Sequence, residues 1–373
     1  MFAKGQTVAQ LMEQLAPKHH AVEGDRIGLQ LGTLNKPIPK VLVALDVTDE
    51  VVEEAIEAGA NMIIAHHAII FRPLAKIDTS TPAGKLYEKL IKHDIAVYIA
   101  HTNLDVTDGG INDWMADMLG IVSEGRTSLE EVHTDKLYKL VVFVPETHGE
   151  QVQQALWNAG AGTIGNYDSC SFVIEGTGTF RPGAGTDPFI GRQGKLEKVK
   201  EVRIETVVPH SIHRAVVQAM LKAHPYEEVA YDLYPIDLKG RSFGLGRVGK
   251  LERPVTLGEL VERVKAAFDV PFVRVVGDLN APVKKLAVLG GSGAKYVRSA
   301  SFAGADVLVT GDIDYHTAHD ALADGMMIID PGHNIEKIMK PRVTEWLAAR
   351  LAERKSTTEV VASQLSTEPF QFV

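Results

Sequence analysis

The sequence predicts an α/β protein in which two related α/β halves form a core and a smaller α+β domain is inserted between them. At each end of the chain, apolar runs typical of buried strands alternate with amphipathic helical segments. Residues 40–67 also align with residues 285–312 without gaps, and the middle of the chain has its own strand and helix pattern. We therefore divide the chain into core residues 1–130, inserted residues 131–245 and core residues 246–373.

The first half begins with helix, strand, helix and strand. Apolar residues recur at helical spacing over Val8–Leu15, and Lys40–Leu45 reads as a buried strand. Thr48–Ala58 is amphipathic, starts with a threonine suited to capping, and is followed by Gly59, which favours a helix stop. Asn61–Ala65 is the next strand, and the short links predict that these two strands are parallel.

The same unit recurs near the other end of the chain. Lys40 aligns with Lys285, and Ala58-Gly-Ala60 aligns with Ala303-Gly-Ala305. This match favours internal duplication, although strand-helix-strand units resemble one another in unrelated proteins. The two copies differ at one chemically important point, because the pair His66-His67 is replaced by Gly311-Asp312.

The inserted segment reads as a ferredoxin-like α+β domain. Its predicted strands and helices are, in order, Leu137–Val144, Glu150–Trp157, Val202–Val208, His213–Leu221 and Val229–Tyr234. The many glycines of Gly176–Gly194 predict an exposed loop. At the end of the chain, the polar segment from about Lys355 onward is expected to be loosely held.

Composition excludes several classes of protein. The net charge is −9, with 39 basic and 48 acidic residues and no dense basic patch, which argues against a nucleic-acid binder. The single cysteine, Cys170, excludes an intrachain disulfide and fits a reducing, cytoplasmic setting. We find neither a signal-peptide core nor a run of roughly 20 apolar residues, so no membrane association is expected.

Three apolar strand-like runs each lead into imidazole or carboxylate side chains. In open α/β sheets, ligands gather outside the carboxyl ends of the strands, so these side chains are expected to meet. Six nitrogen and oxygen donors suggest two metal ions rather than one, with zinc, iron or manganese preferred over calcium or magnesium. The donors are His66, His67, His101, Asp105, His333 and Glu336.

Each pair taken alone also has a purely structural interpretation. Adjacent histidines are often one buried and one exposed side chain, although a bend at a strand end lets both point into one crevice. His101 and Asp105 share one face of a helical turn, and Asp105 is either a carboxylate that bridges two ions or an ordinary turn residue. Glu336 either binds metal or stabilises a helix start. The three clusters together favour the metal site.

Two further motifs remain ambiguous. Leu289–Gly293 is glycine-rich and either cradles a phosphate or forms a tight turn. Gly311–His316, together with His319 and Asp320, supplies partners of the metal ligands, substrate contacts or helix caps. No nucleophile elbow of the G-x-S-x-G type occurs, and Cys170 lacks the sequence context of a nucleophile.

Five motifs carry a family resemblance that covers nearly the whole chain. They are Gly28–Gly32, Ala65–Phe71, His101–Trp114, Thr310–Ile313 and Gly332–Lys337. With them the sequence resembles the Nif-three-like dinuclear-metal family, whose members carry the label GTP cyclohydrolase I type 2 homologue. One departure precedes the first motif, where Glu23-Gly-Asp-Arg-Ile27 stands in place of a Trp-Asp-Asn-type segment.

The resemblance implies a metal site, an assembly and a domain type. Two divalent metal ions per chain, with zinc as the first candidate, would be held by five ligands, and His101 would be an additional ligand or a partner of one. A toroidal homohexamer would turn these sites towards an internal cavity. The insert is similar to the extra domain of longer bacterial members, which resembles small trimeric signalling and metal-tolerance proteins. The implied ligands are His66, His67, Asp105, His333 and Glu336.

Three functions remain open at this point. The first is a metal-dependent, GTP cyclohydrolase-like hydrolase that acts on a nucleotide or a related small molecule. The second is a non-catalytic metal-binding regulatory or interaction protein that uses the inserted domain as a sensor, and the third is a metal chaperone. The sequence assigns no catalytic or substrate-binding residue, and a fold or family does not fix the chemistry.

Overall fold

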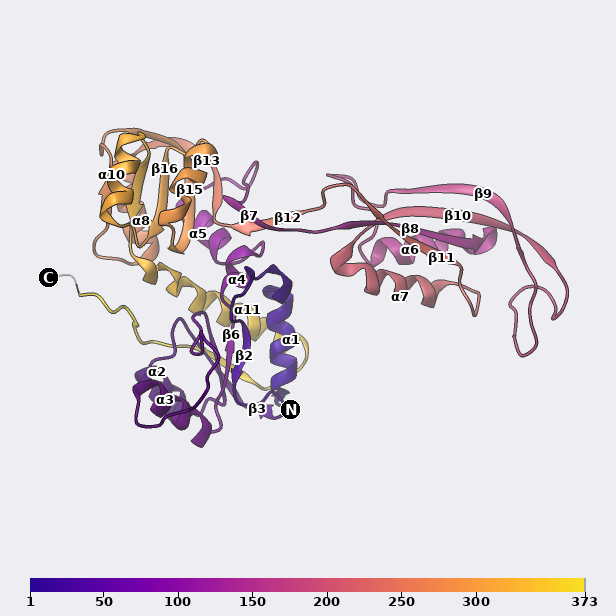
Figure 1. Ribbon diagram of the computed structural model, residues 1–373, viewed down its shortest axis with the longest axis horizontal. Coiled ribbons are helices and arrows are strands. Elements are labelled where there is room, and N and C mark those ends of the chain that lie inside the picture. Colours follow the sequence, from indigo (N-terminus) through magenta and orange to yellow (C-terminus); the bar gives the residue numbers. More distant parts are fainter. Residues whose placement is uncertain (372–373) are drawn as a thin grey trace. The chain divides into compact units, whose positions relative to one another are not determined.

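The computed structural model describes residues 1–371 and divides the chain into two compact units (Figure 1). The first unit joins Met1–His133 to the chain from Phe243 onward, and it contains both α/β halves. The second unit is Thr134–Ser242. Strands β7 (Glu130–Thr134) and β12 (Ser242–Leu245) pair with each other where the chain leaves and re-enters the first unit.

The first half contains a five-stranded sheet in the order β18-β4-β5-β6-β2. Strands β18, β4, β5 and β6 are parallel, and only β2 is antiparallel to its neighbour. The prediction that Lys40–Leu45 and Asn61–Ala65 form parallel strands is therefore confirmed. In sheet order, the strands span Glu359–Ala362, Lys40–Ala44, Met62–Ala65, Ala96–Ile99 and Gly28–Leu31.

Helices cover both faces of this sheet, as expected for parallel strands that are buried on both sides. On one face, Leu42 and Ile63 pack with Val51 of α2 and Leu90 of α3. The Thr48 side chain accepts a hydrogen bond from the Val51 backbone N–H, which confirms the predicted helix cap. The helices of this half are α1 (Gly5–Leu15), α2 (Asp49–Glu57), α3 (Pro82–Lys92), α4 (Thr102–Val106) and α5 (Ile111–Leu119), with a 3₁₀ turn η1 at Lys18–His20 and a short β1–β3 pair at Ala3–Lys4 and Pro37–Ile38.

The second half repeats this plan with the order β13-β15-β16-β17-β14. Its three central strands are parallel and β14 is antiparallel, like β2, whereas β13 is antiparallel to β15. In sheet order, the strands span Arg247–Thr256, Pro282–Ser292, Val307–Gly311, Met327–Asp330 and Arg274–Val276. Its helices are α8 (Leu257–Phe268), α9 (Val297–Phe302), α10 (Tyr315–Ala323) and α11 (Met339–Glu353), with 3₁₀ turns η4 (Ala294–Tyr296) and η5 (His333–Ile338).

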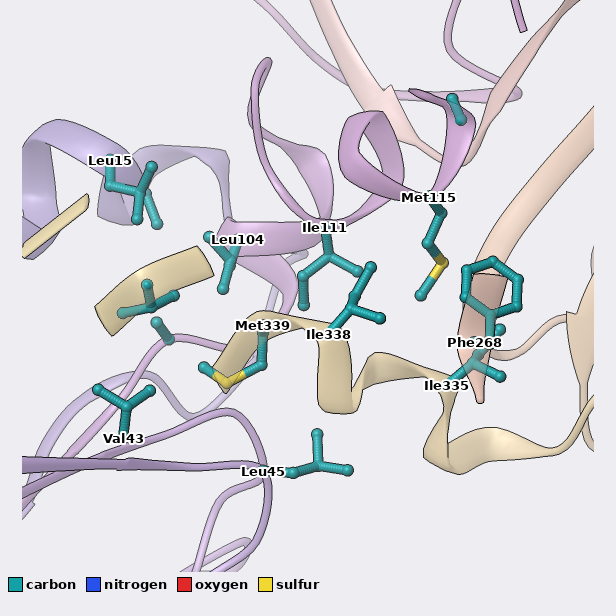
Figure 2. Close-up of a cluster of buried hydrophobic side chains, with 14 of the residues drawn as sticks. Leu15, Val43, Leu45, Leu104, Ile111, Met115, Phe268, Ile335, Ile338 and Met339 are labelled. Atoms are coloured by element: carbon teal, nitrogen blue, oxygen red, sulfur yellow. The ribbon is translucent and has the colours of Figure 1, made fainter. Parts of the chain in front are cut away.

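Within the first unit, one hydrophobic core joins the two halves, and η5 runs through it. Figure 2 shows Ile335 beside Phe268 of the second half, and Met339, at the start of α11, on the side of Val43 of the first half. Ile335 and Met339 have no exposed surface. Because burial of such a side chain contributes about 1.5–3 kcal/mol, packing holds the segment that carries His333 and Glu336 in a fixed position.

The second unit has one antiparallel sheet in the order β11-β8-β10-β9. Its elements follow as strand, helix, strand, strand, helix, strand, and both helices lie on the same face of the sheet (Figure 1). Val142, Ile204, Leu156 and Met220 meet in the core between sheet and helices. The elements are β8 (Leu137–Pro145), η2 (Glu146–His148), α6 (Gly149–Asn158), β9 (Ser171–Phe180), β10 (Glu197–Pro209), η3 (His210–Ile212), α7 (His213–Ala223) and β11 (Tyr231–Ile236).

Two predictions about irregular segments are wrong in part. Gly176–Phe180, assigned to a loop, belongs to β9 and pairs with β10, because the partner strand supplies hydrogen bonds that outweigh the poor strand propensity of glycine. The tail is not loose throughout, because Glu359–Ala362 forms β18 and pairs with β4. The short run Val360-Val361 forms a strand because β4 offers it hydrogen-bonding partners.

Among residues 1–371, no helix has both the length and the apolar character needed to cross a membrane.

Candidate metal site

The structure brings all six predicted donors together at the carboxyl ends of parallel strands in the first unit. His66 and His67 follow β5 directly, and their backbone N–H groups both donate to the carbonyl of Leu45, at 3.1 and 3.0 Å. This shared acceptor bends the chain, so the two imidazole rings lie 5.1 Å apart instead of on opposite faces of a strand. His101 follows β6 at the start of α4, and His333 follows β17 on η5.

The donors form three overlapping groups whose ligand atoms lie within 4.8 Å of one another. Glu336 belongs to two groups, and its Oε2 lies 3.1 Å from His67 Nε2, 3.3 Å from His333 Nε2 and 3.7 Å from His66 Nε2. Asp105 belongs to one group, so the carboxylate shared between groups is Glu336. The groups are His66 with His67 and His101, His67 with His333 and Glu336, and His66 with Asp105 and Glu336.

All four histidines use Nδ1 for a bond away from the centre of the cluster. A protonated Nδ1 donates to a backbone carbonyl or to a carboxylate, which fixes the ring and leaves Nε2 for a metal ion. The acceptors are Ala100 O for His66 at 2.8 Å, Asp46 for His67 at 2.6 Å, Asp25 for His101 at 2.9 Å and Asp312 for His333 at 2.7 Å.

Sequence reasoning missed two of these carboxylates. Asp46 follows β4, so it could have been found by the same pattern that identified the histidines, a polar side chain just after a buried strand. Asp25 lies in the irregular segment before β2, where no periodicity marks it. Asp312 was predicted as a partner of a metal ligand among other roles, and it contacts His333, whereas Asp314 of the same motif caps α10.

Two buried atoms in the cluster have no hydrogen-bond partner among the described residues. They are His66 Nε2 and Asp105 Oδ1, which lie 3.7 Å apart. Leaving such groups unsatisfied costs about 1–3 kcal/mol each, so native proteins rarely do so without a reason. A cation bound between them would satisfy both. The residues therefore fit a divalent ion that takes nitrogen and oxygen ligands.

The glycine-rich stretch after Leu289 contributes to this cluster. It is the end of β15, not a tight turn. A Cβ on Gly290 would lie 3.1 Å from Glu336 Oε1, so the bare backbone makes room for the carboxylate. The Gly290 N–H donates to the side chain of Asn112 at 3.0 Å.

Burial and contacts between imidazoles and carboxylates shift several pKa values in the cluster. Burial opposes charge on His67, but hydrogen bonds to Asp46 and Glu336 outweigh it and raise the pKa of His67 to about 10. The hydrogen bond to Glu336 raises the pKa of His333 to about 9. Burial raises the pKa of Asp105 to about 6. Burial also opposes ionisation of Glu336, but the surrounding imidazoles hold its pKa well below the usual range.

Comparison with known proteins agrees with the motifs. Residues 3–369 match the family model described as Duf34/NIF3 (NGG1p interacting factor 3). The chain is 57% identical over its full length to a GTP cyclohydrolase 1 type 2 homolog of Halalkalibacterium halodurans, of which 99% is covered. It is 54% identical to the protein of that name from Bacillus subtilis, with 99% of this chain and 98% of that protein covered. A crystal structure of a Bacillus cereus protein related to NIF3 matches with a TM-score of 0.93 and 53% identity over both whole chains.

Proposed function

The chain belongs to the Duf34/NIF3 family, and we propose that its core binds two divalent metal ions, zinc first and iron or manganese as alternatives. The observation that carries this proposal is the arrangement of the four imidazoles, which are all held through Nδ1 and converge near two buried carboxylates. The proposed ligands are His66, His67, Asp105, His333 and Glu336, with His101 as an additional ligand or a neighbour of the ions.

The grouping of the donors suggests how the two ions share them. His67 and His333 would hold one ion, and His66 and Asp105 would hold the other, with Glu336 common to both. A carboxylate has two oxygens and can serve two cations, whereas a neutral imidazole offers one nitrogen. His101 lies in one group with His66 and His67, so it could add a further nitrogen ligand.

We further propose that the site is hydrolytic and acts on a nucleotide or a related small molecule. Divalent ions in such a site supply Lewis-acid activation of substrate and water. If His101 is a neighbour of the ions and not a ligand, its Nε2 would accept and release a proton, because Asp25 anchors the opposite ring nitrogen and the side chain is about a quarter exposed. The substrate class follows the names of the relatives, GTP cyclohydrolase 1 type 2 homologs.

The alternative is a non-catalytic metal-binding regulatory protein. The element order of the second unit and its sheet order β11-β8-β10-β9 support a ferredoxin-like domain, which we propose as a sensor in this case. We also retain the homohexamer implied by the family resemblance, which sedimentation measurements would test. Saturable binding of a nucleotide that is never consumed would favour the regulatory function over the hydrolase.

The decisive experiment is metal content per chain, measured by elemental analysis after purification. Wild type should carry about two ions, and Asp105→Ala should lose a large part of them. Asp324→Ala, in the exposed turn after α10, is the matched control and should keep the wild-type content. Wild type that carries no metal and takes up neither zinc nor iron would overturn the proposal. Turnover in a nucleotide and phosphoester screen would then separate hydrolase from regulator.

A further inference from the structure

A cavity of about 300 Å³ lies wholly inside the second unit. It opens on the sheet face that α6 and α7 leave uncovered, because Phe143 and Glu201 alternate along their strands with the core residues Val142 and Val202. The loop after β9 forms its other wall and brings in Phe189. A cavity of this volume matches the smaller sites that bind small molecules.

Aromatic rings form much of the wall. Phe180 and Tyr226 meet edge to face with their ring centres 5.7 Å apart, and Phe189 lies 6.4 Å from Tyr226. Rings arranged at such angles present π faces, which attract cations as well as apolar groups. Phe189 is 53% exposed, so a ligand in the cavity would cover apolar surface of its ring.

The cavity is also acidic. Glu201 is half-buried and accepts a hydrogen bond from the Tyr226 hydroxyl at 2.9 Å, yet no ion pair joins it to a basic side chain of the described residues. Glu227 and Glu228 line the same cavity, and Arg181 is the one basic residue among its lining side chains. The Glu227 carboxylate accepts the Asp187 backbone N–H at 3.2 Å, which ties the loop to the cavity wall.

We propose that this cavity binds a small organic cation, with an amine or guanidinium head and an apolar or aromatic body. The head would pair with Glu201, whose orientation Tyr226 fixes, and the body would lie against Phe180 and Phe189. A charge-assisted hydrogen bond and a cation–π contact would act on the same group. Phosphorylated ligands are disfavoured, because their charge would meet three carboxylates and one guanidinium.

Three probes with one aromatic body and different charge test this inference on the full chain. They are tyramine, which is cationic, tyrosol, which is neutral, and 4-hydroxyphenylacetate, which is anionic. Calorimetric titration should give saturable binding of tyramine, at least tenfold weaker binding of tyrosol, and no binding of the acid. Absence of saturable tyramine binding, or equal binding of all three probes, would overturn the proposal.

Variants locate the binding and separate it from the metal site. Glu201→Gln should weaken tyramine binding by roughly tenfold, and Phe189→Ala, in the exposed loop, should weaken it without a folding defect. Glu150→Gln, on α6, is the charge-matched control and should bind as wild type does. Asp105→Ala should retain tyramine binding, so failure of the metal proposal would leave this one intact. Unchanged affinity in both Glu201→Gln and Phe189→Ala would refute the assignment of the cavity.

Discussion

Gly291 gives the carboxylate of Glu336 the space that it occupies. A Cβ built on Gly291 would lie 2.6 Å from Glu336 Oε1 and 3.3 Å from His333 Nε2. The backbone at Gly291 also has φ +65°, a conformation that residues with side chains rarely adopt. Gly291 therefore lacks a Cβ and has a positive φ at the point where the chain passes Glu336, the carboxylate that belongs to two donor groups.

Gly291→Ala should therefore displace Glu336 and lower the affinity for divalent metal. We expect at least a tenfold loss, in addition to a strain of about 1–3 kcal/mol in the free energy of unfolding. Gly325→Ala is a sharp control, because Gly325 has φ +72° but no atom lies within 4 Å of the position that its new methyl group would take. Zinc titration against a chromophoric chelator measures the affinity. Equal affinities in both variants would mean that steric contact with Glu336 is unimportant.

Asp46 links the C-terminal segment to the proposed metal site. Its Oδ1 accepts from His67 Nδ1 at 2.6 Å, and its other carboxylate oxygen accepts from the Thr367 hydroxyl. Removal of a carboxylate behind a ligating histidine typically costs 10–100-fold in metal affinity, so Asp46→Ala should fall in that range. Thr367→Val should cause a smaller loss and Thr367→Ser almost none, in the same zinc titration. A Thr367→Ser protein as weak as Thr367→Val would argue against a role for the hydroxyl.

His224 should make the second unit less stable in mild acid. Its Nε2–H donates to the Phe143 carbonyl at 2.9 Å and its Nδ1 accepts the Tyr226 backbone N–H at 3.1 Å, so the fold holds the neutral ring. Burial lowers the pKa of His224 below the usual 6.5. Below about pH 6.5 the unfolded chain binds the proton more readily, so this contribution to stability is full above that pH and declines as the pH falls towards the folded pKa.

Denaturant unfolding at pH 7.5 and at pH 5.5 measures this effect. Wild type should lose more stability between the two values than His224→Gln, which cannot take up the proton. His213→Gln, on α7 of the same unit, controls for the loss of any histidine and should keep the wild-type pH dependence. Identical pH dependence in wild type and His224→Gln would contradict the prediction.

The proximity of the six side chains could be predicted from the sequence because each of them follows a local pattern. His66, His101 and His333 come after apolar strands, and parallel strands end at the same edge of a sheet, so their proximity did not require knowledge of distant contacts. Asp25 shows the limit of this reasoning, because it reaches His101 from an irregular segment 76 residues away. No spacing rule marks such a contact.

Elements that depend on a distant partner also escaped prediction. Glu359–Ala362 becomes a strand only because the edge of β4, more than 300 residues earlier in the chain, offers it hydrogen bonds. The acidic, aromatic cavity of the second unit is similar in this respect. Glu201 lies on β10 and Tyr226 in the loop between α7 and β11, and their hydrogen bond arises from how these segments pack.

Removal of metal should destabilise the core of the first unit. The buried atoms His66 Nε2 and Asp105 Oδ1 then face each other without a hydrogen-bond partner, and the nearby Glu336 adds a second buried carboxylate. An ion that binds only the folded state stabilises it by about 2.7 kcal/mol at a hundredfold excess over its dissociation constant. Chelator-treated protein should therefore melt several degrees lower than metal-loaded protein, and zinc should restore the transition. Asp105→Ala should melt at one temperature with or without zinc if it has lost the site, whereas a zinc response of wild-type size would show that the stabilising ion binds elsewhere.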